Sequence, residues 1–403
     1  MYLKFIISFF GFVSGFLLLI TGNTLNFWIA REGVSTQTIG LFSLVSAPYA
    51  LNFLWAPIFD RVTLEFMPIK VHFRIKWVLV LYVAGFFACM LISISATKNL
   101  LLSGVLSLVI SFINSSQDVV LNAYRAEYTP ESQKASSSGF YIIGYRMGMI
   151  LSGPAAIYAS DYISFETEYR IFALIYLIFF GIIIGIDQAS SVVNDKSHSR
   201  LVYIVRDIFA SIGKTTTVIM LLSFLILYRV GDNFIGVMLN PYLLSLGFEV
   251  DQIAISGKFC GIVGSSIGGI WASGILNGGN ISICLAKFGI LHAVAHIGYI
   301  LLSLYKGSSS ALFIATIFDS VTGGMTMTCY IALITSLCKG KYKTTQYAIF
   351  SSMMGISRTI LPSISGYIVA FANWEMFFIL STIMVIPSLM ILKKLEPVIK
   401  NRV

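Results

Sequence analysis

The chain has 403 residues, of which 57% are hydrophobic and only 11% are charged, and its formal net charge is +9. Soluble proteins are about 25% charged, so a soluble globular protein is excluded. The apolar stretches are continuous instead of alternating, which predicts membrane-spanning helices and excludes a β-barrel. The basic residues lie mostly in short segments between these stretches, where they are typical of membrane topology, so nucleic acid is not expected as a partner.

Twelve apolar runs follow one another along the chain, and most approach or exceed the roughly 20 residues that cross a bilayer. The runs are 5–25, 37–58, 77–97, 100–127, 138–160, 170–187, 217–246, 252–274, 281–304, 310–337, 346–371 and 374–392. A longer polar segment separates the sixth run from the seventh. We therefore predict an all-α polytopic membrane protein with the major facilitator fold, in which twelve transmembrane helices form two six-helix halves.

The predicted parts of the chain follow from these runs. They are an N-terminal half (1–187), a cytoplasmic linker (188–216), a C-terminal half (217–392) and a cytoplasmic tail (393–403). Apolar residues recur at helical spacing from Leu201 to Ile212, which predicts an amphipathic linker helix on the inner membrane surface. With the N-terminus inside, the outside loops hold only Arg31, Lys98, Arg170 and Lys306. Both termini are therefore predicted to be cytoplasmic, since cytoplasmic loops carry the excess of Lys and Arg.

Asp118 lies deep inside the fourth apolar run. A carboxylate there costs roughly 3 kcal/mol on insertion scales, and such residues normally serve ion or substrate pathways. Arg146 lies at a similar depth on the next run, so the two side chains are predicted to approach or pair. A carboxylate beside a permanent cation is suited to proton coupling, and we assign this role to Asp118 and to Glu127 at the inner end of the run. A static ion pair that locks two helices together is the alternative.

The second half contains further charges within its apolar runs. Arg229 and Asp232 are spaced i, i+3 and therefore share a helix face. Asp319 and Arg358 lie at similar estimated depths, so a second ion pair is possible there. His292 and His296 are spaced i, i+4, but the residue after His292 is Ala293, so this is not an H-E-x-x-H zinc site. We interpret the two histidines as the polar face of an interior helix.

Other polar side chains in the membrane runs mix amides with aromatic rings, a combination suited to sugar hydroxyls and ring faces. Together with several intramembrane charges they form the candidate substrate-binding set: Asn23, Tyr49, Asn52, Asn114, Gln117, Tyr141, Tyr145, Arg146, Asp232 and Arg358. No convincing arrangement of catalytic residues is found, so the chain is not expected to be an enzyme, and no metal or cofactor is predicted. The five cysteines are interpreted as apolar packing residues.

Asp60 and Arg61 follow Ala56 at the inner end of the second run. This stretch resembles the G-x-x-x-D-R core of the loop motif of the major facilitator superfamily, with alanine at the glycine position. In that superfamily the acid and the arginine contact neighbouring helix ends on the cytoplasmic side. The resemblance therefore implies an inner gate formed by Asp60, Arg61 and Arg125, with Glu127 as a further partner.

Several stretches together resemble the AmpG muropeptide permeases of the major facilitator superfamily along nearly the whole chain. They are 11–15, 21–28, 32–34, 53–57 with Asp60 and Arg61, 116–125, 144–146 with 152–153, 231–234, 345–348 and Arg358. In 116–125 the family's pattern Q-D-x-x-x-D-A-Y-R has Asn122 where a second aspartate is usual.

The resemblance implies proton-coupled import of N-acetylglucosaminyl-1,6-anhydro-N-acetylmuramyl peptides from periplasm to cytoplasm, across a bacterial inner membrane. The expected partners are this substrate, protons and the lipid bilayer, and the protein is expected to be a monomer. A symporter for another bulky polar solute, such as a peptide, a sugar or an acyl-carrier derivative, is the alternative within the same class. A membrane sensor or enzyme that transports nothing is the alternative from another class.

Overall fold

The computed structural model describes residues 2–62, 64, 71–95, 99–128, 134–186, 215–276, 280–337 and 343–402. These residues are almost entirely helical and include no strand. They form two compact units. Unit 1 comprises Met1–Glu32 and Leu44–Asn194, and unit 2 comprises Gly33–Ser43 and Asp195–Val403. The predicted all-helical membrane fold is confirmed.

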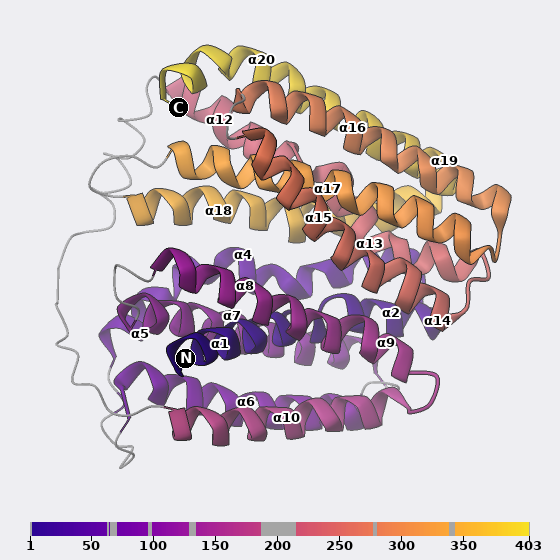
Figure 1. Ribbon diagram of the computed structural model, residues 1–403. Helices are drawn as coiled ribbons and strands as arrows, with labels where there is room; N and C mark the ends of the chain where they lie inside the picture. The colour runs from indigo at the N-terminus through magenta and orange to yellow at the C-terminus, as the bar shows by residue number, and fades with distance from the viewer. Residues whose placement is uncertain are drawn as a thin grey trace. The chain divides into compact units, whose positions relative to one another are not determined.

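Unit 1 is built around the long helix α7, which carries Asp118. Its helical elements are α1 (Tyr2–Ile20), α2 (Asn23–Arg31), α4 (Ala47–Leu51), η2 (Asn52–Leu54), α5 (Ala56–Arg61), α6 (Phe73–Ser95), α7 (Leu100–Tyr128), α8 (Lys134–Ile150), η4 (Leu151–Ala155), α9 (Ala156–Ala159) and α10 (Phe165–Ile186). Helix α1 packs along α8, and α6 packs between α7 and α10 (Figure 1). The η4 segment is a π-helical turn that contains Pro154, and a proline inside a helix removes a backbone hydrogen bond and disturbs the regular ladder.

Unit 2 contains the remaining helices and the short helix α3. Its elements are α3 (Thr36–Leu41), α12 (Thr215–Leu227), α13 (Val230–Ser245), α14 (Val250–Gln252), η5 (Ile253–Phe259), α15 (Cys260–Leu276), α16 (Ile281–Leu302), η6 (Ser303–Tyr305), α17 (Ser309–Leu337), α18 (Lys343–Thr359), η7 (Leu361–Ile364), α19 (Ser365–Ile383) and α20 (Val385–Arg402). The η1 segment (Phe42–Ser46) joins α3 to unit 1 along the chain. Helix α17 packs against both α15 and α16 (Figure 1), so it lies at the centre of the unit's contacts.

The described residues of the twelve predicted runs lie almost entirely in helical segments, while residues 96, 97 and 187 lie outside the described residues. Among the described residues nine segments are long and apolar enough to cross a membrane, and the last of them, Ile349–Lys400, covers most of two predicted runs. Within it the backbone at Asn373 has φ 70° and ψ 174°, which interrupts α19 between those two runs. The run at 37–58 is divided into α3, η1, α4, η2 and α5. The predicted linker helix, from Leu201 to Ile212, lies outside the described residues, and the predicted domain boundaries remain a prediction.

The distribution of side chains is that of a protein solvated by lipid. Large apolar side chains such as Leu101, Ile270 and Phe371 are exposed, whereas Ser107, Ser111 and other small polar side chains are buried. In a membrane the backbone N–H and C=O groups form their hydrogen bonds within helices, and the apolar helix faces contact lipid. Close helix contacts then depend on small residues.

Glycines allow α1 and α8 to approach until their backbones touch. A Cβ on Gly144 would lie 1.8 Å from the carbonyl oxygen of Ser8, and one on Gly148 would lie 2.1 Å from that of Phe12. In α1, a Cβ on Gly11 or on Gly15 would meet the carbonyl oxygen of a residue of α8 in the same way. The G-x-x-x-G pair in 144–148 therefore forms a helix–helix interface.

We expect Gly144→Ala to lower the stability of the purified protein, because the new methyl group collides with backbone that cannot rotate away. Overpacking of this kind typically costs about 1–3 kcal/mol. Gly181→Ala is the matched control, since a Cβ at Gly181 meets nothing within 4 Å. Thermal unfolding in detergent should show a clear decrease in midpoint for Gly144→Ala alone. Equal midpoints for the two variants would contradict the tight α1–α8 contact.

Candidate functional site

Asp118 lies on the inner face of α7 and is surrounded by polar side chains of unit 1. The amide nitrogen of Asn122 donates to its carboxylate over 3.2 Å and to its backbone carbonyl over 2.9 Å. Ser14, Arg125 and Tyr141 also act on the carboxylate. Asn122 stands one helical turn from Asp118, so it is in position to donate. An ionised aspartate at position 122 would have no hydrogen to give.

Arg125 and Tyr141, two of the groups near Asp118, contact each other. The guanidinium of Arg125 lies 4.0 Å from the ring centroid of Tyr141, a cation–π contact that places the charge near Asp118. The Tyr141 ring stacks on that of Tyr145, with centroids 6.2 Å apart. The cation described near Asp118 is thus Arg125, which the sequence had suggested for the gate. The predicted approach of Asp118 and Arg146 stays a prediction.

Gln117 and Asn114 differ sharply in how their amides are used. Asn114 donates to the carbonyl of Leu17 over 3.0 Å and accepts from the hydroxyl of Tyr176, so its amide joins α7 to α1 and α10. Gln117 is fully buried, and neither of its amide atoms has a hydrogen-bond partner among the described residues. A buried polar group without a partner typically costs about 1–3 kcal/mol. Gln117 is therefore a candidate for contact with water or a bound solute.

The other predicted substrate-binding residues of unit 1 are partly buried and lie on different elements. They are Asn23 on α2, Tyr49 on α4, Asn52 on η2, and Tyr145 and Arg146 on α8. Their role in binding stays a prediction. The side chains of Asp60, Arg61 and Glu127, predicted for the gate and the proton pathway, lie outside the described residues.

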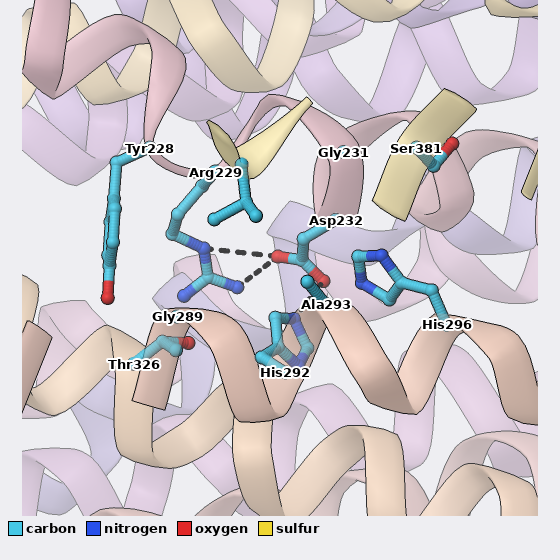
Figure 2. A pocket seen from close by; sticks show the side chains of 11 residues that line it. Tyr228, Arg229, Gly231, Asp232, Gly289, His292, Ala293, His296, Thr326 and Ser381 are labelled. Carbon is cyan, nitrogen blue, oxygen red and sulfur yellow. Dashed lines mark hydrogen bonds and ion pairs between the residues drawn. The ribbon is translucent and has the colours of Figure 1, made fainter. Parts of the chain in front are cut away.

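A second polar group lies inside unit 2, and Figure 2 shows its pocket. Arg229, which precedes α13 as its N-cap, binds the Oδ2 atom of Asp232 through two nitrogens, so the two residues lie together as their spacing predicted. The Nε2 atom of His292 lies 3.2 Å from Asp232 Oδ1. His296 completes this wall of the pocket, with its ring centroid 4.9 Å from that of His292.

Asp319 on α17 adjoins the same histidines. Its Oδ2 atom accepts from the hydroxyl of Tyr299 over 3.1 Å. Its Oδ1 atom lies 3.8 Å from His292 Nδ1 and 3.9 Å from His296 Nε2. We call Asp232, His292, His296 and Asp319 the histidine–aspartate cluster. Within the described part of the chain no ion pair joins Asp319 to Arg358, which is exposed, so the possible second pair is not found.

The donor set of this cluster resembles a metal site only in part. Ligand atoms of Asp232, His292 and His296 lie within 4.8 Å of one another, and imidazole with carboxylate suits several divalent metals. However, the guanidinium of Arg229 already binds the carboxylate of Asp232. A dication beside that fixed positive charge would be repelled, so the residues fit a metal ion poorly.

Sequence reasoning found members of the cluster and missed the cluster itself. Their spacing placed His292 with His296 on one face of a helix, and Arg229 with Asp232 on one face of another. Depth estimates placed Asp319 near the membrane centre. None of these signals gives the rotation of α17 about its axis, which decides that Asp319 faces α16 and not Arg358. That rotation is set by packing, including Gly323, where a Cβ would lie 3.0 Å from the His292 ring.

Comparisons with known proteins decide the family. The chain is 45% identical over 399 residues to the protein called "Putative transporter AmpG 1" of Rickettsia bellii, covering 97% of each chain. The chain belongs to the AmpG family of transporters. It is also 27% identical over 390 residues to the "Anhydromuropeptide permease" of Escherichia coli K12, covering 95% of this chain and 77% of the relative. The AmpG resemblance of the sequence stretches is thereby confirmed.

The superfamily is supported by two further comparisons. The family model described as "Major Facilitator Superfamily" matches residues 281–402. A bacterial homologue of the human lysosomal transporter Spinster superimposes with a TM-score of 0.72 at 12% identity, covering 100% of this chain and 97% of the other. The nucleoside transporter NupG gives a TM-score of 0.71 at 14% identity, covering 99% and 100%. This AmpG-family protein is a multi-pass membrane transporter with the major facilitator fold, and it is not an enzyme.

Proposed function

We propose that this AmpG-family transporter carries anhydromuropeptides from the periplasm to the cytoplasm in symport with protons. The observation that carries the substrate class is the 27% identity, over 95% of this chain and 77% of the relative, to a protein named anhydromuropeptide permease, together with 45% identity to a relative named AmpG transporter. Residues for which the sequence predicted binding, such as Gln117 and Tyr141, lie beside Asp118 in unit 1.

The proton step is assigned to Asp118. Its carboxylate lies within a candidate membrane span, accepts a hydrogen bond from the amide of Asn122, and experiences the positive charge of Arg125 on the same helix. An ionisable residue inside the membrane that faces a polar interior is typical of a proton or substrate pathway. The substrate then contacts the amide of Gln117, whose donor and acceptor are both free for it within the described residues.

For this function we place the protein in a bacterial inner membrane, as a monomer with both termini cytoplasmic. Its two halves give access to a site near the bilayer centre from alternate sides. Arg146 and Arg358 are proposed to contact carboxylates of the peptide, since arginine binds carboxylate in a planar, bidentate manner. Asn23, Tyr49, Asn52 and Asp232 complete the proposed binding set.

The test is uptake of a labelled anhydro-disaccharide tripeptide into proteoliposomes that contain the purified full-length protein. An imposed inward proton gradient should drive accumulation, and collapse of the gradient with a protonophore should abolish it. Excess unlabelled muropeptide should compete, whereas unrelated peptides and sugars should not. Competition by an unrelated bulky solute would show that the substrate class is not muropeptides. Accumulation that does not depend on the gradient would contradict proton coupling.

A further inference from the structure

Apart from Asp232, which belongs to the proposed binding set, the histidine–aspartate cluster has no part in the function proposed above, yet it is a built polar site inside unit 2. It draws its side chains from α13, α16 and α17. His292 and His296 are 6% and 3% exposed. Its polar atoms are incompletely paired, because neither ring nitrogen of His296 bonds another side chain among the described residues, and Asp319 Oδ1 accepts no hydrogen bond there. Buried polar groups left in this way call for an explanation.

The hydrogen bonds of Thr322 bear on where one proton of His292 lies. The Thr322 hydroxyl lies 2.8 Å from the carbonyl of Phe318 and 2.9 Å from that of Asp319, to which its own hydrogen can bond. When that hydrogen is on a carbonyl, the Thr322 oxygen accepts from His292 Nδ1 at 2.9 Å. In this arrangement His292 carries a hydrogen on Nδ1.

The other nitrogen of His292 faces a carboxylate that is held ionised by contact with an arginine. Asp232 Oδ1 lies 3.2 Å from Nε2, and Asp232 Oδ2 is bound by Arg229. If Nε2 were bare, its lone pair would oppose the negative oxygen of Asp232. A second proton on Nε2 turns this repulsion into attraction, because both ring nitrogens are donors in the imidazolium.

Among the groups in direct contact with His292 and Asp232, the charges balance when that proton is present. Arg229 offsets Asp232, and the carboxylate of Asp319 then remains, 3.8 Å from His292 Nδ1. A buried charge without a counter-charge is costly, and an imidazolium on His292 supplies one. A divalent metal ion would instead leave the group positive. The cluster is therefore suited to a single proton.

Neighbouring elements present further charged and titratable groups to the cluster. They are Tyr228 and Arg229 in the turn between α12 and α13, Tyr299 of α16, Tyr330 of α17 and Lys258 of η5. Lys258 acts on Asp319 electrostatically, although among the described residues no ion pair within 4.0 Å joins them. It is the cation that remains for Asp319 when His292 is neutral. Lys258 lies in the π-helical segment η5, and such segments frequently occur at functional sites.

The pocket offers the proton a route to the cluster. His296 and Ser381 both line it, next to Asp232 and His292 (Figure 2). The His296 ring interacts with the backbone of Ser381, and neither of its nitrogens has a side-chain hydrogen-bond partner among the described residues, so it can pass a proton between a water in the pocket and its neighbours. A neutral imidazole accepts a proton on one nitrogen and releases one from the other, which leaves it unchanged after transfer.

We propose that His292, held between Asp232 and Asp319, binds one exchangeable proton and forms a second proton site of the transporter. The proton enters from water through His296, binds His292 Nε2 and leaves by the same groups. That this proton is moved together with substrate rests on the proposed function. Two coupled protons would then drive about hundredfold accumulation for a pH difference of one unit, where one proton drives about tenfold.

The binding of the proton is tested without substrate. The full-length protein is labelled with 15N-histidine, reconstituted in liposomes, and its imidazole nitrogen signals are followed between about pH 8 and pH 5, the range in which histidine usually changes charge. We expect one imidazolium signal that His292→Gln removes, and that Asp319→Asn displaces toward lower pH. Asp251→Asn, an exposed carboxylate of the same unit, should leave it unchanged.

A neutral His292 throughout this range would overturn the proposal, and so would saturable Zn²⁺ binding that is lost in His296→Gln. A transport measurement then tests separately whether the proton bound at His292 is coupled to substrate transport. If wild type accumulates muropeptide and Asp319→Asn accumulates about tenfold less, the coupled second proton is supported. Equal accumulation by both overturns the coupling and leaves the proposed function intact. If wild type transports no muropeptide, the proposed function fails, while the imidazolium signal still decides whether His292 is a proton site.

Discussion

Asp118→Asn is expected to lower proton-driven accumulation of anhydromuropeptide by at least about tenfold at a pH difference of one unit. Asparagine keeps the size and the hydrogen-bonding oxygen of the side chain but cannot bind and release a proton. One proton moving down one pH unit supplies about 1.4 kcal/mol, which is a factor of ten in concentration. Exchange of labelled for unlabelled substrate across the membrane needs no net proton movement and should persist. Both quantities are measured in the same proteoliposomes.

Two further variants make the result specific to Asp118. Glu166→Gln removes a carboxylate in the first turn of α10, which is not among the groups that act on Asp118, and should accumulate substrate like wild type. Asp118→Glu keeps an ionisable group and should restore part of the gradient-driven uptake. Full accumulation by Asp118→Asn would show that another carboxylate of the chain, and not Asp118, carries the proton. Loss of both exchange and accumulation would mean that Asp118 is needed for binding or folding.

Arg229→Met should be the most destabilising single substitution in unit 2. It leaves the carboxylate of Asp232 buried without the guanidinium that binds it, and breaking a buried pair in this way typically costs about 3–5 kcal/mol. The double variant Arg229→Met with Asp232→Asn removes both charges and should recover most of the loss. The measurement is thermal unfolding of the purified proteins in detergent, checked by retention of monodispersity.

An exposed ion pair in the same unit provides the control for this comparison of single and double variants. Lys400 and Glu396 are spaced i, i+4 and lie 2.9 Å apart, with side chains 57% and 36% exposed. Pairs of this kind contribute about 0.3–0.5 kcal/mol, so Lys400→Met should hardly change the unfolding midpoint. If Arg229→Met were equally harmless, the Asp232 carboxylate would not depend on Arg229. A double variant as unstable as the single one would mean that the cost comes from lost packing of the arginine stem.

The sequence alone was sufficient for the class, the fold and the family. Membrane helices are determined by local composition, because in lipid every backbone group must be bonded within its own segment. Continuous apolar runs therefore predict their own structure without knowledge of their neighbours. The spacing of Arg229 and Asp232 also predicted a shared face, since i, i+3 neighbours meet on any helix. Breaks within a run, such as η4 at Pro154, changed the regularity of the helices.

What only the tertiary structure decided is which polar faces meet. A residue's depth follows from counting along one helix, whereas its neighbours depend on how each helix is rotated and how closely it packs. Gly144 allows α1 and α8 to touch, and that contact positions Tyr141 beside Asp118. The packing of α16 against α17 likewise positions His292 beside Asp319. Because these rotations are fixed by contacts between residues far apart in the sequence, the distances within both polar sites could be obtained only from the folded chain.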